Sequence, residues 1–426
     1  MVSALALVAA ASLLGGVLRD ERSAGAAPSL TFEAKRLEAG FTSGTTTSLV
    51  RDLQERLRTN PNSARAWALL GLGYQQLARE SGDASFYPKS QGALHRALAL
   101  EPHDLTATVA LGSLALSQHR FRDALALGNS ARSISPTTAR VYGVVGDALV
   151  ELGRYPAAFS AFRTMVQLKP STASYARYSY ARELVGDREG AVRWMRLARD
   201  AATDQRESYA WTSVQLGKLY WNAGRTKAAA REYRAALAVV PDYVYAFDAL
   251  ARVEAASGRY ARAIALEQRA VDTIPLPQFV AQLGDLQRAV GNVRAARDQY
   301  ATIGAIDRLL RANGVGTDLE SAAFAADHGR ASVALARRAH AARPSVDGDD
   351  VLAWALARAG RCQDALPWSR RALRLGTRDS LKFFHRAWIE RCVGHEALSR
   401  AWARGAVALN PHFSLQWGAQ ARRLAR

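Results

Sequence analysis

The side chains that could perform catalysis are scattered along the chain and form no catalytic pattern. The eight histidines lie far apart, and no phosphate-binding glycine loop, Gly-x-Ser-x-Gly elbow or His-Glu-x2-His motif occurs. Asp327-His328-Gly329 and His385-Arg386 are the two most suggestive places, but Asp and His are also common at helix ends. Cys362 has no identifiable base near it. The sequence therefore predicts no catalytic residue, no metal site and no cofactor, and we expect a protein that is not an enzyme.

Arginine dominates the charge of the chain. The formal net charge is +19, and lysine occurs at only six positions. One interpretation is binding to nucleic acid or to another anionic surface, and the other is an ordinary solvated helix surface. The arginines are spread rather than clustered, and no basic run alternates with aromatic residues as a base-stacking groove requires. The sequence therefore favours a solvated surface, and nucleic acid is not expected as a partner.

Prolines recur at a fixed interval along the chain. Pro102, Pro136 and Pro170 are 34 residues apart, and so are Pro241 and Pro275. Each would end a helix, because proline lacks a backbone donor and clashes with the preceding turn. A fixed period of about 20 to 50 residues indicates a solenoid built from small helical or mixed units. Alanine-rich stretches and a hydrophobic content of 49% agree with a packed, all-α chain.

The residues between the prolines repeat as well. The first unit contains Trp67-x2-Leu70-Gly71-x2-Tyr74, and the fifth contains Leu216-Gly217-x2-Tyr220 followed by Ala229-x3-Tyr233. In both, a small residue lets two helices approach and a large one fills the space between them. With these motifs, nearly the whole chain resembles the tetratricopeptide repeat superfamily. The resemblance implies a right-handed α-solenoid of antiparallel helix pairs, capped by further helices at both ends.

We expect one solenoid domain over residues 48–426, since a solenoid grows without needing a new core. Ser48–Arg58 is the predicted capping helix, Ser414–Ala425 the closing helix, and Ser81–Ser90 a long loop inside the first unit. A helix over Ala305–Ala312 is broken by Asn313-Gly314, which could kink the array. The first helices of about ten units are predicted to start near Ala64, Leu105, Ala139, Thr172, Ala210, Val244, Pro277, Val315, Val346 and Ser380.

The resemblance implies that the first helix of each unit lines a concave groove. Positions that the motif does not use for packing face this groove, and several carry aromatic or charged side chains, the types that anchor interfaces. The predicted peptide-binding groove comprises Tyr180, Trp211, Lys218, Trp221, Asn222, Tyr245, Arg252, Arg288, Trp354 and Trp388. For Trp211, Trp221 and Trp388, burial against neighbouring helices is an equally good interpretation.

The two cysteines are placed where they could meet. Cys362 follows Gly360 at the start of a second helix, and Cys392 precedes Gly394 at the end of the next first helix. In stacked antiparallel helices these two ends lie on the same side of the array, so a disulfide is possible if the Cα atoms come within about 7 Å. Two unrelated buried thiols are the alternative.

The N-terminus carries a separate signal. Residues 2–18 are uncharged and apolar, a charged cluster follows at 19–22, and small residues occupy 24–26. Such a run is typical of a signal peptide or membrane anchor, although a buried helix would also fit. We predict a signal or anchor over residues 1–26 and a linker over 27–47. The protein would then be exported, or held at the outer face of the cytoplasmic membrane by a tether at residues 2–18, where a disulfide can persist; a cytoplasmic protein is the alternative.

The function predicted from these features is a non-enzymatic scaffold for protein–protein interaction. It would hold an extended peptide or a protein surface in the concave groove, and the partner itself is not identified by the sequence. The alternative is an arginine-rich binder of an anionic polymer or of a membrane surface. Salt dependence separates the two, because binding to a polyanion weakens steeply as salt rises.

Overall fold

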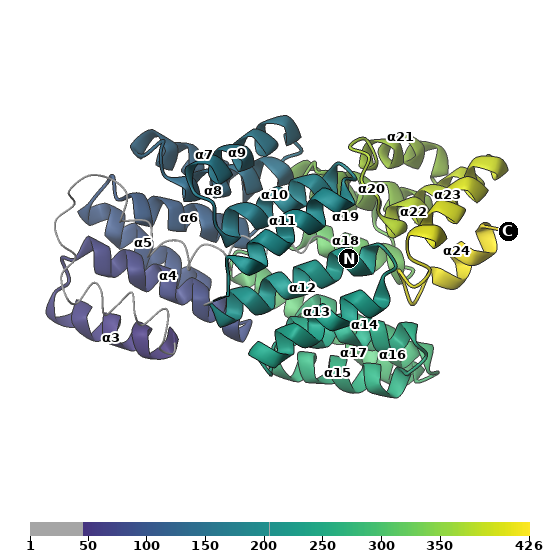
Figure 1. Ribbon diagram of the computed structural model, residues 1–426, viewed down its shortest axis with the longest axis horizontal. Coiled ribbons are helices and arrows are strands. Elements are labelled where there is room, and N and C mark those ends of the chain that lie inside the picture. The colour runs from purple at the N-terminus through teal and green to yellow at the C-terminus, as the bar shows by residue number, and fades with distance from the viewer. Residues whose placement is uncertain (1–45, 204) are drawn as a thin grey trace.

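The chain folds as a continuous array of antiparallel helix pairs (Figure 1). This computed structural model describes residues 46–203 and 205–426. Within those two ranges every regular element is a helix, and no strand occurs. The all-α solenoid predicted from the sequence is therefore confirmed.

Ten first helices line the inner side of the array. They are α4 (Ala64–Ser81), α6 (Leu105–Ser117), α8 (Ala139–Glu151), α10 (Thr172–Leu184), α12 (Arg206–Asn222), α14 (Val244–Ala256), α16 (Pro277–Ala289), α18 (Asp318–Asp327), α20 (Val346–Arg358) and α22 (Ser380–Cys392). Eight of the ten begin at the predicted residue, whereas α12 begins four residues before Ala210 and α18 begins three residues after Val315.

Each first helix is followed by a second helix that packs against it. The second helices are α5 (Phe86–Leu100), α7 (Phe121–Ile134), α9 (Tyr155–Leu168), α11 (Arg188–Asp200), α13 (Thr226–Val239), α15 (Tyr260–Thr273), α17 (Val293–Ala312), α19 (Val333–Ala342), α21 (Cys362–Ala372) and α23 (Glu396–Leu409). The predicted capping helix is α3 (Thr46–Thr59), and the predicted closing helix is the shorter α24 (Gly418–Leu424).

The prediction of a long loop over Ser81–Ser90 is wrong. α4 continues to Ser81 and stops at Gly82, which adopts a left-handed φ of 71° and donates its N–H to Ala78 O. α5 already begins at Phe86. Pro88 does not prevent this helix, because the N–H groups of a first helical turn have no partner within the helix.

A glycine in the first helix and a large side chain in the second set the distance between paired helices. In three units the partner is an aromatic residue sixteen positions later: Gly146 meets Phe162, Gly217 meets Tyr233 and Gly284 meets Tyr300. A Cβ atom added at any of these glycines would overlap the facing ring. The motif glycine is thus required by close packing rather than by backbone conformation, since each lies inside a helix.

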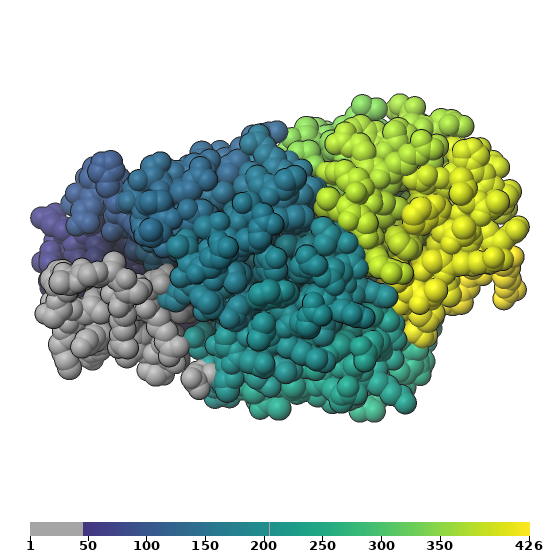
Figure 2. Space-filling model, turned by 45° about the horizontal axis from the view of Figure 1, so that its top comes forward, coloured from purple at the N-terminus to yellow at the C-terminus, as the bar shows by residue number. Residues whose placement is uncertain are grey.

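The array winds tightly enough to meet itself one superhelical turn later. Turns inside the first five units lie against loops that follow the last five, beginning with Gly82 against Ile274. The hydrogen bonds between these turns and loops join residues 189 to 198 positions apart. We call this line of contacts the seam. In the space-filling view, the lime-green and yellow C-terminal units lie directly against the teal units (Figure 2).

One joint between neighbouring units differs from all the others. Elsewhere, each second helix packs along the first helix of the next unit, but α17 and α18 share few close backbone contacts. The connecting residues include Asn313 and Gly314, and Gly314 has a φ of 79°. The predicted helix over Ala305–Ala312 is the second half of α17, so the break after it falls where the sequence indicated one.

Gly217→Ala should destabilise the protein, because the new Cβ would overlap the Tyr233 ring. Overpacking a close contact costs about 1–3 kcal/mol. Gly92→Ala is the matched control, since Gly92 lies in α5 with open space around it and a helical Gly→Ala change stabilises by about 0.5–1 kcal/mol. Thermal or urea unfolding measures both. Equal effects of the two substitutions would contradict the packing described for the fifth unit.

Candidate functional site

The concave faces of α10, α12 and α14 carry several polar and aromatic side chains, and we call this region the groove. Tyr180, Lys218, Asn222, Tyr245 and Arg252 lie here, and all five are half-buried. Their positions follow from the repeat: the small motif residues of each helix pack against the neighbouring helices, which leaves these larger side chains on the inner side. The structure therefore brings Tyr180, Lys218, Asn222 and Arg252 together around Glu183 and Asp248. Tyr245 lies at the start of α14, where its ring contacts Tyr243 and Phe279.

Three predicted groove tryptophans are not available to a partner. Trp211 and Trp221 are each 5% exposed and belong to the central hydrophobic core. Trp354 is 2% exposed; it stacks on His385 and donates its indole N–H to Asp327. For Trp211 and Trp221 the structure agrees with the alternative interpretation, burial against neighbouring helices, whereas the expectation that Trp354 faces the groove is wrong, because the helices pack closely enough to cover it.

The two remaining predicted groove residues lie elsewhere on the array. Trp388 is half-buried in an aromatic cluster with Trp354 and Trp417, far along the chain from the groove helices. Arg288 is exposed near the end of α16. Neither belongs to the groove as the structure forms it.

Most polar groups of the groove are paired within the chain, but one is not. Asn222 donates to the Glu183 carboxylate at 3.1 Å, and Arg252 pairs with Asp248 at 2.9 Å. Lys218, in contrast, has no hydrogen-bond or ion-pair partner among the residues that the structure describes. Burial lowers the pKa of the Lys218 amine, and the charge of Asp248 opposes this. The Lys218 ammonium group is therefore available to bind an anionic group of a partner.

The part of the groove on α10 lies close to the chain's own C-terminal units. The Thr377 hydroxyl, just before α22, donates to Leu184 O at the end of α10. Asp347 at the start of α20 acts electrostatically on Tyr180, as Asp379 and Lys382 at the start of α22 do on Glu183. Burial raises the pKa of Tyr180 well above its ordinary value, and it also raises the pKa of Glu183. The sequence analysis missed these facing residues, because nothing in a 34-residue pattern shows which units meet a full turn later.

The two histidine sites noted in the sequence have structural partners. His328 Nε2 lies 3.0 Å from Asp285 Oδ1, and its ring stacks on Phe324. His385 Nδ1 lies 3.0 Å from Asp350 Oδ2. Within residues 46–203 and 205–426, no three histidine, cysteine or carboxylate side chains gather closely enough to hold a metal ion.

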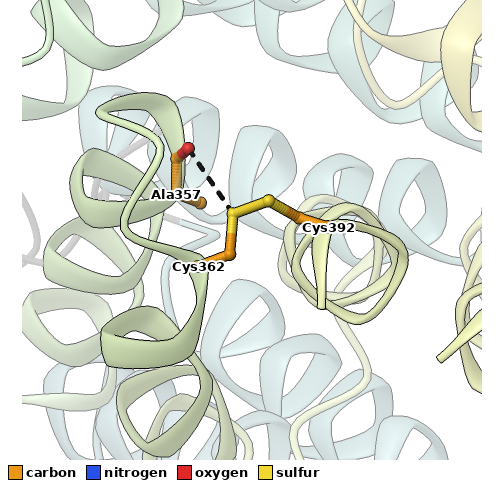
Figure 3. The surroundings of a disulfide bond; sticks show 3 residues. All are labelled: Ala357, Cys362 and Cys392. Atoms are coloured by element: carbon orange, nitrogen blue, oxygen red, sulfur yellow. Dashed lines mark hydrogen bonds between the residues drawn. A yellow bond between two sulfur atoms is a disulfide. The ribbon is translucent and has the colours of Figure 1, made fainter. Parts of the chain in front are cut away.

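Cys362 and Cys392 form a disulfide, as Figure 3 shows. Their Cα atoms are 5.9 Å apart, within the usual range for such a bridge. The Cys362 sulfur also lies 3.9 Å from the carbonyl oxygen of Ala357. The bridge joins the start of α21 to the end of α22, and it therefore ties the ninth unit to the tenth.

The predicted signal or anchor and the linker, residues 1–45, lie outside the described part of the chain. Among the helices that the structure does describe, none combines the length and the apolar character that crossing a membrane requires.

Comparison with known proteins agrees with the repeat architecture. The tetratricopeptide repeat family matches residues 76–139 and 214–276. Arrays of this family generally serve as non-enzymatic scaffolds for protein–protein interaction. A search of curated proteins finds none that matches this sequence.

Several solved structures are similar in fold. TTC0263 of Thermus thermophilus, a tetratricopeptide repeat protein, is 21% identical, covers 46% of this chain and 99% of its own, and has a TM-score of 0.40. The Cut9–Hcn1 hetero-tetramer of APC/C is 12% identical over 93% of this chain and 97% of its own, with a TM-score of 0.37. The human IFIT1 dimer with PPP-AAAA is 14% identical over 87% and 94%, with a TM-score of 0.48. These overall likenesses are loose, so the family assignment depends on the repeat pattern and the paired helices.

Replacing both cysteines by alanine should loosen the last two units. The bridge closes a loop of 30 residues, and such a loop corresponds to about 3–4 kcal/mol of stabilisation in the chain-entropy model. Calorimetry of the wild-type protein without reductant, compared with the Cys362→Ala/Cys392→Ala variant, should show a lower melting temperature in the variant. Reductant should lower the melting temperature of the wild-type protein alone. If it lowers both equally, the bridge is not what stabilises these units.

Proposed function

We propose, from the premise that this chain is a tetratricopeptide repeat protein, that it is a non-enzymatic scaffold which holds an extended peptide or a protein surface in the groove. The observation that carries the proposal is the unpaired Lys218 beside Asn222 and Arg252. A half-buried cation without a partner is costly, and an acidic side chain of a bound peptide would satisfy it. Tyr180 and Tyr245 offer aromatic contact on either side along the same inner face.

The first experiment identifies the partner by its place of contact. A photo-crosslinking amino acid is placed at Tyr245 in the groove and, in a separate protein, at Arg163, which is exposed on α9. After irradiation of native cells, we expect a protein crosslinked from position 245 but not from position 163. Crosslinks that form only from position 163 would place the binding surface outside the groove.

A pair of charge reversals then tests the groove chemistry. Lys218→Glu should weaken binding of the identified partner by about tenfold or more, because loss of a buried charge partner affects affinity strongly. Lys227→Glu is the matched control, since it makes the same charge change on an exposed position of α13. Isothermal calorimetry at two salt concentrations provides the measurement.

The same measurement decides the alternative function, a binder of anionic polymer or membrane surface driven by arginine. This alternative is favoured by exposed arginines on four second helices: Arg163, Arg193, Arg231 and Arg262. If both lysine variants weaken binding equally, and affinity falls by about 10³-fold or more between about 50 and 200 mM salt, counterion release dominates. That result would replace the groove proposal.

We also propose that the protein works outside the cytoplasm or at the outer face of the cytoplasmic membrane. The disulfide supports this location, because such bridges form and persist in oxidising compartments. Fractionation of native cells, with thiol alkylation before lysis, is the test. Intact protein with two alkylated cysteines in the cytosolic fraction would reject it.

A further inference from the structure

The last three units, α18 to α24, form a separately packed block, which we call the C-terminal arm. Most of their buried apolar side chains make one cluster that runs from Leu319 to Leu424 and includes none from earlier units. Val346, by contrast, is buried in the core of the earlier units, and Leu375 packs against that core. The disulfide lies inside the block. The arm therefore has a core and a covalent tie of its own, and it shares only a small apolar contact with the preceding units.

The joint that connects the arm to the rest of the array is mainly polar. Whereas the other second helices pack along the next first helix, α17 and α18 share few close backbone contacts and meet through side chains. The Thr317 and Ser321 hydroxyls donate to Asp307, and Arg311 pairs with Asp318 at 2.7 Å. His328 Nε2 lies 3.0 Å from Asp285 of α16, and the Tyr300 ring contacts Phe324 and His328. A joint of this kind, next to a left-handed Gly314, has the features of a hinge.

The seam holds the arm against the groove by a few hydrogen bonds. The N–H of Val346 donates to the Tyr155 hydroxyl at 2.7 Å, and the Thr377 hydroxyl donates to Leu184 O at 2.6 Å. The Asn410 amide donates to Trp221 O at 2.9 Å. These contacts are spaced one unit apart along the arm, so they form together when it swings closed.

One ion pair sits in the middle of the seam and is poorly compensated. The Arg343 guanidinium donates to Glu151 across the seam and to Glu320 within the arm at 3.1 Å, but its Nη2 has no partner. Burial raises the pKa of Glu151 even though Arg343 opposes it. Buried pairs of this kind contribute little net stability while they fix the register of two surfaces. The closed state is thus well defined, and its apolar contact with the core of the earlier units is limited to Val346 and Leu375.

We infer that the C-terminal arm is an intramolecular lid: it closes over the groove through the seam and opens at the joint after α17 to admit a partner. In the closed state, Asp347 acts electrostatically on Tyr180, as Asp379 and Lys382 do on Glu183, and the Thr377 hydroxyl donates to Leu184 O at the end of α10. The inference rests on the proposed function only for the kind of partner that the open lid admits. Opening itself can be measured without any partner.

The probe for opening is acetylation of lysine by a small N-hydroxysuccinimide ester, followed by mass spectrometry of the full-length protein. Lys218 reports on the groove, and the exposed Lys227 is the internal control in the same molecule. Thr377→Val removes one seam hydrogen bond and keeps the shape of the side chain. We expect it to raise the rate of Lys218 acetylation by about two- to tenfold, the range for one lost hydrogen bond, with no change at Lys227.

Arg343→Gln should open the lid further, because it leaves Glu151 without its partner, and the radius of gyration from X-ray scattering should rise. Arg269→Gln is the matched control, since Arg269 forms an exposed ion pair with Asp242 and no hydrogen bond of the seam involves either residue. Circular dichroism checks that helix content is kept. Unchanged Lys218 acetylation in both seam variants would overturn the inference, and so would loss of helix content in both, because the seam would then be a part of the core fold.

A final measurement separates the lid from the proposed function. If the seam variants open and also bind the crosslinked partner more tightly, both proposals gain support. If they open and the affinity does not change, the lid is supported and the groove is not the partner's site. If they stay closed while Lys218→Glu still weakens binding, the groove proposal stands and the lid is rejected.

Discussion

Contact between successive superhelical turns is the constraint on which the rest of this structure depends. An array of ten helix pairs that returns on itself after about 190 residues must fit its inner turns against its own later loops. Gly153 shows how narrow the fit is, because a Cβ there would overlap the carbonyl oxygen of Pro344. The corresponding Gly186 faces Gly376 in the same way. Glycine in these turns therefore serves two purposes: it closes a helix in the left-handed conformation, and it allows the next turn to approach.

Contact between superhelical turns also changes the environment of polar side chains on the concave face. In a short array the inner side of the first helices is open to solvent, and polar side chains there need no partner. Here the later units cover it, so Glu183 relies on Asn222, and Asp147 relies on Arg177, which donates to it at 2.8 Å from a fully buried position. A buried polar group is tolerated when it is hydrogen-bonded. Lys218 is the exception within the groove, which is why the proposed function rests on it.

Local features of the fold could be predicted from the sequence, and features between distant units could not. Proline spacing and the paired motif of glycine and aromatic residue placed first helices such as α8 and α14 at their observed starting residues, because both signals act within one unit. The loop predicted at Ser81–Ser90 is wrong because Pro88 lies in the first turn of α5, where a helix accepts proline. The seam has no signature in a 34-residue pattern, since its partners lie about 190 residues apart.

Access of a partner to the groove and movement of the C-terminal arm both depend on the joint after α17. A covered groove can bind a peptide only if the cover moves, and a cover can move only if its own packing survives the motion. The apolar cluster and the disulfide of the arm would keep it packed during the motion. The largely polar joint and seam would allow it to move. A continuous apolar core through α17 and α18 would have removed the possibility, because a packed core has a single arrangement rather than a range of them. The one weakly packed joint in the array is therefore the feature that reconciles a closed superhelix with a scaffold function.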